Sequence, residues 1–189
     1  MARPLILARI AATALALALF CAPAGAQKSG GILRMYMTAS PASMSIHEEA
    51  TAFAQSPMMG VFNNLVVFDQ HAKQSTLQSI VPDLASEWSW DEGGTRLTLK
   101  LREGVKWHDG AAFTAKDVVC TYDLLLEKSA DKLRANPRKQ VLKNLDRVTA
   151  DGDFQVSFHL KRPQPAFMML IAHGFAPIYP CHVPAAQMR

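Results

Sequence analysis

The sequence is short of the features that mark nucleic-acid-binding proteins and disulfide-rich proteins. Of its 189 residues only three are cysteine, and the formal net charge is only +4. Nucleic-acid binding needs a clustered basic face, and this charge is too small and too dispersed to supply one. The tightest basic cluster is Lys132, Arg134, Arg138 and Lys139, which is typical of a solvated loop. We therefore expect no nucleic-acid partner.

The sequence also lacks a catalytic motif with a defined spacing. It has no Gly-x-Ser-x-Gly elbow, and no histidine pair at i, i+4 that would place two imidazoles on one helix face. The best candidate metal ligands are His47, Glu48 and Glu49, or His108 with Asp109. One alternative is an exported metal-dependent hydrolase that uses His47, Glu48, His108 and Asp109. We otherwise expect no enzyme, no catalytic residue, no metal and no cofactor.

Only one long apolar run is present, and it lies near the N-terminus. Ile10 to Cys21 is too short to span a bilayer, follows Arg3 and Arg9, and precedes a small-x-small site ending at Ala26. This pattern predicts a signal peptide at residues 1–26 that is cleaved after Ala26. Cleavage lowers the formal net charge to +2 and implies an exported, periplasmic protein.

The three cysteines lead to different expectations. Cys21 raises the alternative of lipid attachment, but Phe20 occupies a position where such a signal needs a small residue. Cys120 and Cys181 form an even pair in an exported chain, so a disulfide is one alternative. Because Cys120 falls in an apolar helical run, we favour a buried, unpaired thiol.

Hydrophobic periodicity predicts a mixed α/β chain. Alternating apolar and polar residues predict a hairpin from Trp88 to Leu101 and a further strand from Phe154 to Leu160. An apolar segment follows at residues 166–172. The other expected elements are a strand at residues 32–37, a helix at 56–64, a strand at 65–68 and a short helix at 82–86.

The stretch from Leu101 to Val119 contains polar residues with local backbone roles. Asp109 and Gly110 are typical of a turn, and Thr114 and Asp117 have the spacing of a capping box at the start of a helix. We therefore interpret the stretch mainly as a folding signal rather than a catalytic or metal site. By the same reasoning Trp88, Trp90 and Trp107 are expected to pack the fold and not to stack on a ligand.

Several ordered motifs resemble one protein family. They are Gly30-Gly31-x-Leu33, Val81-Pro82-Asp83-Leu84-Ala85-x-x-Trp88, Leu101-Arg102-x-Gly104-Val105-Lys106-Trp107-His108-Asp109-Gly110, Thr114-Ala115-x-Asp117-Val118 and Pro177-Ile178-x-Pro180. In order and spacing they resemble the family 5 extracellular solute-binding proteins. These are the dipeptide-, oligopeptide- and nickel-binding components of ABC importers.

The resemblance implies a two-lobed periplasmic-binding-protein fold with a subdomain inserted in the first lobe. On that pattern residues 27–50 begin lobe I, residues 51–171 form the inserted subdomain, and residues 172–189 return to lobe I. Family members are about three times longer than the mature chain. We therefore expect an N-terminal part that is truncated before the second lobe, and an inactive remnant is a further alternative.

The resemblance also implies a site and partners. The backbone before Ser43 approaches the ligand in peptide binders of the family, which points to Ser40, Pro41 and Ala42. The family's Ser-Leu-Asp-Pro-His is Ser43-Met44-Ser45-Ile46-His47 here, so its Asp-Pro step is lost. The implied ligand is a peptide or similar small polar solute. The implied protein partner of this monomer is an inner-membrane ABC permease.

Overall fold

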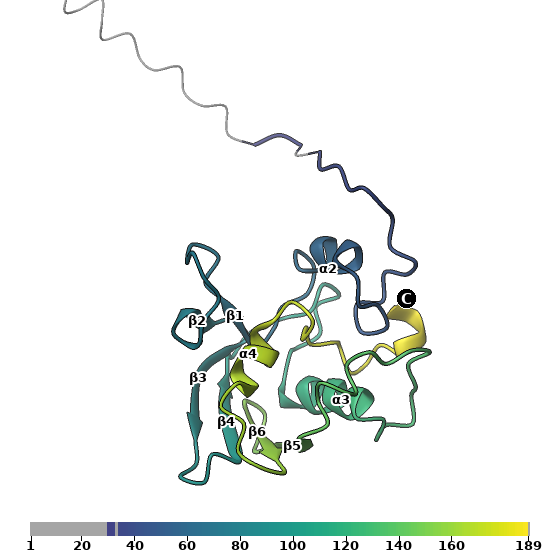
Figure 1. The fold of residues 1–189 in the computed structure, drawn as a ribbon. Coiled ribbons are helices and arrows are strands. Elements are labelled where there is room, and N and C mark those ends of the chain that lie inside the picture. The colour runs from purple at the N-terminus through teal and green to yellow at the C-terminus, as the bar shows by residue number, and fades with distance from the viewer. Residues whose placement is uncertain (1–29, 33, 189) are drawn as a thin grey trace, which may run out of the picture. The chain divides into compact units, whose positions relative to one another are not determined.

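The computed structural model describes residues 30–32 and 34–188, so the expected signal peptide lies outside the described residues (Figure 1). The chain divides into two units between Tyr36 and Met37. The strand expected at residues 32–37 is wrong, because its described residues are irregular and Ile32, Met35 and Tyr36 are largely exposed. A strand needs a hydrogen-bonded neighbour, and no described strand pairs with this segment.

An antiparallel four-stranded sheet forms the centre of the second unit. Its strand order is β3 (Ala85–Trp90), β4 (Arg96–Leu101), β6 (Gln155–Leu160) and β5 (Leu145–Ala150). A separate antiparallel pair consists of β1 (Val66–Phe68) and β2 (Ile80–Pro82). The expected hairpin and the expected strands at 65–68 and 154–160 are therefore confirmed. Strands β2 and β5 were missed, because neither shows a clear alternation over its short length.

One face of the sheet is buried under α3 (Ala115–Leu125), which lies against β5 and β6 (Figure 1). Leu97 and Leu99 of β4 are fully buried. Tyr122 of α3 meets Phe158 of β6 edge to face, with ring centroids 4.7 Å apart. Burying such side chains contributes about 1.5–3 kcal/mol each. This face is the core that the alternating pattern predicted.

Two expected helices need correction. The helix expected at 56–64 is α2 (Ala52–Met58), which begins four residues earlier because the Thr51 side chain caps it by accepting from the Ala54 N–H. The helix expected at 82–86 does not form. Asp83 instead lies between β2 and β3, and its carboxylate accepts from the Asn64 N–H at 3.0 Å. That long-range contact holds the backbone of residue 83 in a connection between strands.

The capping box at the start of α3 is confirmed. The Thr114 N–H donates to the Asp117 carboxylate at 2.9 Å, and Asp117 is almost fully buried. The second carboxylate oxygen of Asp117 accepts from the Cys181 N–H at 2.8 Å. Asp117 therefore both caps the helix and fixes a segment that lies 64 residues later in the sequence.

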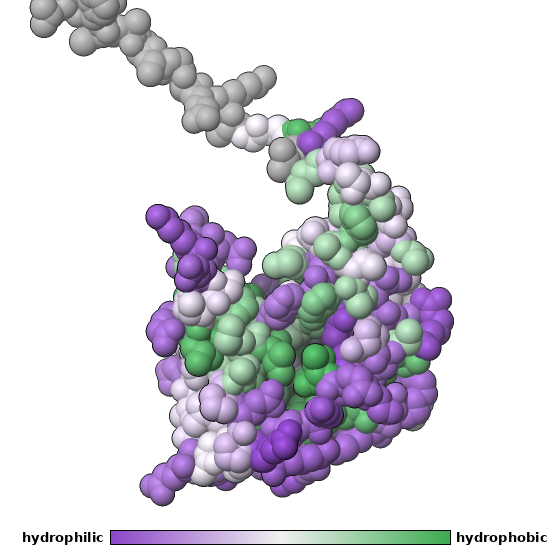
Figure 2. Space-filling view, viewed as in Figure 1, coloured by the Kyte–Doolittle hydropathy of each residue, from purple (hydrophilic) through white to green (hydrophobic). Residues whose placement is uncertain are grey.

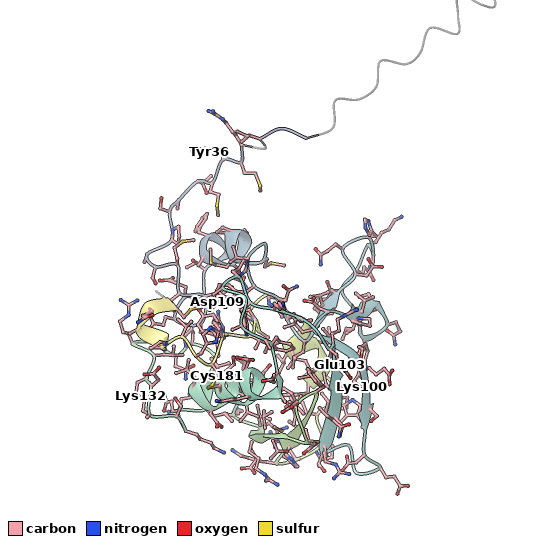
Figure 3. All side chains as sticks on the ribbon, turned by 180° about the vertical axis from the view of Figure 1, so that it is seen from behind. Tyr36, Lys100, Glu103, Asp109, Lys132 and Cys181 are labelled. Atoms are coloured by element: carbon pink, nitrogen blue, oxygen red, sulfur yellow. A yellow bond between two sulfur atoms is a disulfide. The ribbon has the colours of Figure 1, made fainter. Side chains whose placement is uncertain are left out.

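The expectation of unpaired thiols is wrong, because Cys120 and Cys181 form a disulfide (Figure 3). Their Cα atoms lie 5.6 Å apart, within the usual range for a disulfide. The Thr121 hydroxyl also accepts from the Tyr179 N–H at 2.9 Å. Three neighbouring contacts from α3 thus hold the segment 177–185 in place, which a helical pattern around Cys120 does not reveal.

The tryptophans pack as expected. Trp107 packs edge to face on Phe113, with ring centroids 6.0 Å apart. Trp90 packs in the same way on Phe167 of α4 (Phe167–Ala172), with ring centroids 6.4 Å apart. Trp88 is half-buried against the core. Two short 3-10 helices, η1 (Leu77–Ser79) and η2 (Ala185–Met188), complete the fold. Within the described part of the chain, no helix combines the length and the apolar character needed to cross a membrane.

Candidate functional site

The residues expected to approach a ligand lie in irregular chain at the start of the second unit. Ser40 and Ala42 are exposed and Pro41 is half-buried. Immediately after them the segment 45–48 becomes buried and forms a turn. The exposed residues therefore depend for their position on the anchoring of this turn, named here the anchor segment (residues 43–49).

Glu48 is one fixed point of the anchor segment. Its carboxylate accepts from the Arg134 backbone N–H and Nε, both at 2.8 Å, and from Arg134 Nη2 at 2.6 Å. The Glu48 side chain is only 4% exposed, whereas that of Arg134 is 57% exposed. These hydrogen bonds raise the pKa of Arg134, with the Glu48 charge as a further cause. The pair ties the anchor segment to a loop 86 residues away.

Arg138 is the second fixed point. Its Nη2 donates to the carbonyls of Ile46 and Glu49, both at 2.6 Å, and its Nε donates to the Phe175 carbonyl at 3.2 Å. Burial lowers the pKa of Arg138 to about 10, so the guanidinium stays charged at neutral pH. The interpretation of the basic cluster as a solvated loop is therefore wrong for Arg138, which is buried among carbonyls from distant segments. Lys132, Arg134 and Lys139 are exposed, as expected.

His47 is fully buried within the anchor segment. Its ring lies 4.2 Å from that of Tyr179, centroid to centroid, and neither ring nitrogen makes a hydrogen bond of normal geometry. Burial, with the nearby Arg138 charge as a second cause, lowers the pKa of His47 to about 3, although the Pro177 carbonyl opposes the shift. His47 is therefore neutral at physiological pH and acts as a packing residue.

A large apolar groove lies next to the anchor segment. It has a volume of about 1140 Å³ and extends from Ile46 and Ala50 past the end of α2 to α4. Hydrophobic side chains occupy this hollow in the space-filling view (Figure 2). The members that lie near α2 or α4 include Met58, Met59, Phe62, Met169 and Leu170. The groove gives this face of the chain a concave, largely apolar surface.

Asp83 supplies a carboxylate to the groove that sequence reasoning did not select as a site residue. Asn63 Nδ2 donates to it at 2.9 Å, and it also accepts from the Asn64 N–H. Burial raises the pKa of Asp83, while these two asparagines lower it. The only sequence signal for this residue was its place in the Val81-Pro82-Asp83-Leu84 motif.

The four residues of the hydrolase alternative do not assemble into a metal site. Glu48 binds Arg134, and His47 packs on Tyr179. Asp109, which is labelled in Figure 3, pairs with His182 at 2.6 Å. Across the described residues, no group of three or more histidine, cysteine or acidic side chains is arranged to hold a metal ion. The hydrogen bond from His182 lowers the pKa of Asp109. The hydrolase alternative thus lacks its ligand set in the described chain.

Residues 79–187 match the family model of bacterial extracellular solute-binding proteins, family 5 middle. The chain belongs to this family. It is 33% identical to a probable di/tripeptide-binding protein 5 of Pseudomonas aeruginosa over 138 residues, covering 63% of this chain and 24% of that protein. It is 38% identical to a periplasmic alpha-galactoside-binding protein of Rhizobium meliloti over 84 residues, covering 41% of this chain and 12% of that protein.

A dipeptide-binding protein from Pseudoalteromonas sp. SM9913, solved with Met-Leu, has the same fold over part of its length. The TM-score is 0.65 at 21% identity, covering 75% of this chain and 30% of that one. The chain spans about a quarter of the length of the first of these curated relatives. The expected family and the expected α/β periplasmic-binding-protein fold are therefore confirmed. Proteins of this family are solute-binding proteins and not enzymes.

Proposed function

We propose that this chain contributes to the periplasmic solute-binding component of an ABC importer, which binds a peptide or similar small polar solute and delivers it to a membrane permease. The observation that carries the proposal is the family match over residues 79–187. Relatives named for di/tripeptides and alpha-galactosides support a small polar solute as the ligand class. The protein acts as a monomer, and residues 1–26 direct it to the periplasm.

Ser40, Pro41 and Ala42 form part of the ligand wall in this proposal. They lie in a stretch without helix or strand that precedes the buried anchor segment. The N–H groups of Ser40 and Ala42 and the three carbonyls are therefore not used by a helix or a sheet. Backbone N–H and C=O groups are suitable partners for the polar main chain of a peptide. The buried contacts of Glu48 and Arg138 limit the movement of this wall.

The mechanism is binding by closure rather than chemistry on the ligand. A clamp desolvates its ligand between two lobes, and the ligand stabilises the closed population. The proposed division is residues 27–50 and 172–189 in lobe I, with residues 51–171 as its inserted subdomain. This chain then supplies one wall, and most of a small ligand's surface must be buried for tight binding.

Calorimetry with a panel of dipeptides, tripeptides and alpha-galactosides tests the proposal on two proteins. The first is the 189-residue chain, for which we expect dissociation constants weaker than about 1 mM because one wall leaves the ligand solvated. The second is a chimera in which residues 37–188 replace the matching part of the Pseudomonas relative. We expect the chimera to bind peptides saturably, at least tenfold more tightly than the chain alone.

Bulky substitutions at the wall provide the matched comparison. Ala42→Trp should abolish peptide binding by the chimera, while Glu92→Trp in the exposed β3–β4 turn should leave it unchanged. Circular dichroism confirms that each variant is folded. A folded chimera that binds no peptide or galactoside would contradict the solute-binding proposal. Unchanged binding by Ala42→Trp would contradict only the assigned wall.

A further inference from the structure

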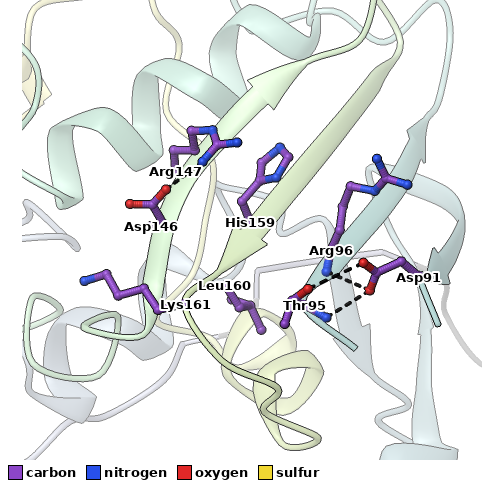
Figure 4. Close-up of a pocket in the computed structure, with 8 residues that line it drawn as sticks. All are labelled: Asp91, Thr95, Arg96, Asp146, Arg147, His159, Leu160 and Lys161. Carbon is purple, nitrogen blue, oxygen red and sulfur yellow. Dashed lines mark hydrogen bonds and ion pairs between the residues drawn. The ribbon is translucent and has the colours of Figure 1, made fainter. Parts of the chain in front are cut away.

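Three basic residues form a row across the solvent-facing side of the sheet, opposite the face that α3 covers. Arg96 of β4 is the register partner of His159 of β6, which is in turn the register partner of Arg147 of β5. Figure 4 shows the three side chains next to one another on three neighbouring strands. The row therefore places two guanidinium groups on either side of one imidazole ring. Protonation of His159 would add a third positive charge between them, which a bound anion would stabilise.

The row lies in a shallow cavity of about 630 Å³. Lys161 also lines the cavity, and its Nζ donates to the Lys143 carbonyl. The two acidic residues of the cavity have other local roles. Asp91 accepts from the backbone N–H groups of Thr95 and Arg96, both at 2.9 Å, and closes the hairpin turn. Asp146 pairs with the adjacent Arg147 at 2.7 Å.

The two donors nearest the centre of the row have unused hydrogen-bonding capacity. Among the described residues, the Arg96 guanidinium makes no hydrogen bond, although its backbone N–H donates to Asp91 and its charge is one of the lesser causes that lower the pKa of that carboxyl. His159 Nε2 interacts with the Thr149 hydroxyl at 3.1 Å, which orients the ring and leaves Nδ1 for another partner. A guanidinium presents several N–H donors in a fork that fits two oxygens of one oxyanion.

We propose that the Arg96–His159–Arg147 row binds a tetrahedral oxyanion of the phosphate type. The oxygens bridge the guanidinium of Arg96 and the ring of His159, while Arg147 and Lys161 add charge from the sides. This site lies on the sheet face away from α3 and is independent of the proposed solute site. The same chemistry would recognise a free phosphate or the phosphate of a lipid headgroup, because both present charged, unesterified oxygens.

The site should respond to pH through His159. Burial, and then the charge of Arg147, lower the pKa of His159; Arg96 acts in the same direction, while Asp151 and Asp146 oppose it. A bound dianion favours the imidazolium and therefore raises this pKa. By linkage, protonation of His159 strengthens anion binding by the same free energy. Binding is thus expected to tighten as the pH falls through the pKa of His159.

The test is an NMR titration of the His159 ring in the full chain, with and without sulfate. Sulfate replaces phosphate as the probe because its charge does not change between about pH 5 and 8, and chloride at matched ionic strength corrects for screening. We expect sulfate to raise the pKa of His159 by about half a unit or more. Arg96→Gln and Arg147→Gln should each remove most of that rise.

Lys100→Gln is the matched control. Lys100 lies on the same face of β4, four residues from Arg96, and pairs only weakly with Glu87 at 3.9 Å. The sulfate-induced rise should persist in this variant. If Lys100→Gln also loses the sulfate-induced rise in the pKa of His159, the effect is general screening and the proposal is overturned. An equal rise with chloride would have the same meaning.

Vesicles separate the two sources of the anion. Phosphatidylglycerol vesicles should retain the wild-type chain more than phosphatidylcholine vesicles do if the headgroup is the ligand, and Arg96→Gln should remove that difference. A response to sulfate without vesicle retention identifies a free oxyanion. If neither probe responds in the folded wild-type chain, the proposed site does not exist.

Discussion

At the scale of single residues, the chain positions its candidate ligand wall with buried polar groups. Glu48, Arg138 and His47 come from or contact the anchor segment, and all three are at least nine-tenths buried. Glu48 and Arg138 have charge-assisted hydrogen bonds, which are stronger than neutral ones. His47 has instead a ring contact and little polar compensation. The anchor segment should therefore be sensitive to acid and to loss of Arg138.

The first prediction concerns pH. The pKa of His47 falls from 6.5 to about 3 on folding, so the unfolded state binds more protons between these values. The buried neutral ring of His47 therefore causes no loss of stability well above pH 6.5. As the pH falls from 6.5 toward 3, the free energy of unfolding decreases, by about 2 kcal/mol at pH 5. Urea unfolding at pH 7.5 and pH 5 should show a smaller loss for His47→Phe than for the wild type. The exposed His108→Phe should behave as the wild type, and equal losses in all three would contradict the prediction.

The second prediction concerns Arg138. Arg138→Met keeps the volume but leaves the Ile46 and Glu49 carbonyls without their charged donor. A lost hydrogen bond to a charged group and an unsatisfied buried carbonyl should together lower the free energy of unfolding by about 2–4 kcal/mol. Hydrogen exchange in residues 43–49 should speed up. The exposed Lys143→Met should change neither quantity, and an unchanged exchange rate in Arg138→Met would exclude the anchoring role.

At the scale of elements, helix α3 connects the sheet to the segment 177–185. Its buried face packs on the sheet through Tyr122, and its first turn holds Asp117. The side of the helix that carries Cys120 and Thr121 binds the later segment. One element thus fixes two parts of the chain, so its cap has more than a local effect.

The third prediction compares the two halves of the capping box. Thr114→Ala should lower the free energy of unfolding by about 1 kcal/mol, the usual effect of losing a cap. Asp117→Ala should cost about 2–3 kcal/mol, because it also leaves the Cys181 N–H without its acceptor. Lys116→Ala in the same turn serves as the exposed control. Equal effects of the two cap variants in urea unfolding would show that the second contact adds nothing.

At the scale of the whole chain, the fold is held by contacts between residues far apart in sequence. Arg134 meets Glu48 across 86 residues, Asn64 donates to the His173 carbonyl across 109, and the disulfide joins positions 61 apart. These contacts bring the anchor segment, the groove and the segment 177–185 into one unit. Loss of the covalent link should therefore weaken the whole unit.

The fourth prediction concerns that link. The double variant Cys120→Ser, Cys181→Ser should lose about 3–4 kcal/mol of unfolding free energy, because a long loop is no longer closed in the unfolded state. Reductant should lower the stability of the wild type toward that of the variant and leave the variant unchanged. A wild type that reductant does not destabilise, with its thiols shown to be reduced, would contradict this expectation.

The sequence by itself determined the elements that have a local signature. The β3–β4 hairpin, β6 and the cap of α3 were predicted, because alternation and capping depend on residues within a few positions of one another. The family was predicted from ordered motifs that include Trp107 and Asp117, and the match over residues 79–187 confirmed it. The assignment of Ser40, Pro41 and Ala42 to the ligand wall remains a prediction.

The tertiary structure alone decided which distant residues meet. Nothing near Cys120 in sequence indicates Cys181, and nothing near Arg138 indicates the carbonyls of Ile46 and Glu49. The Arg96–His159–Arg147 row could not be predicted from the sequence either, because its three residues come from three different strands. Such pairings depend on how the strands align and how the chain returns to α3. Local propensity does not encode that geometry, and only packing of the whole core selects it.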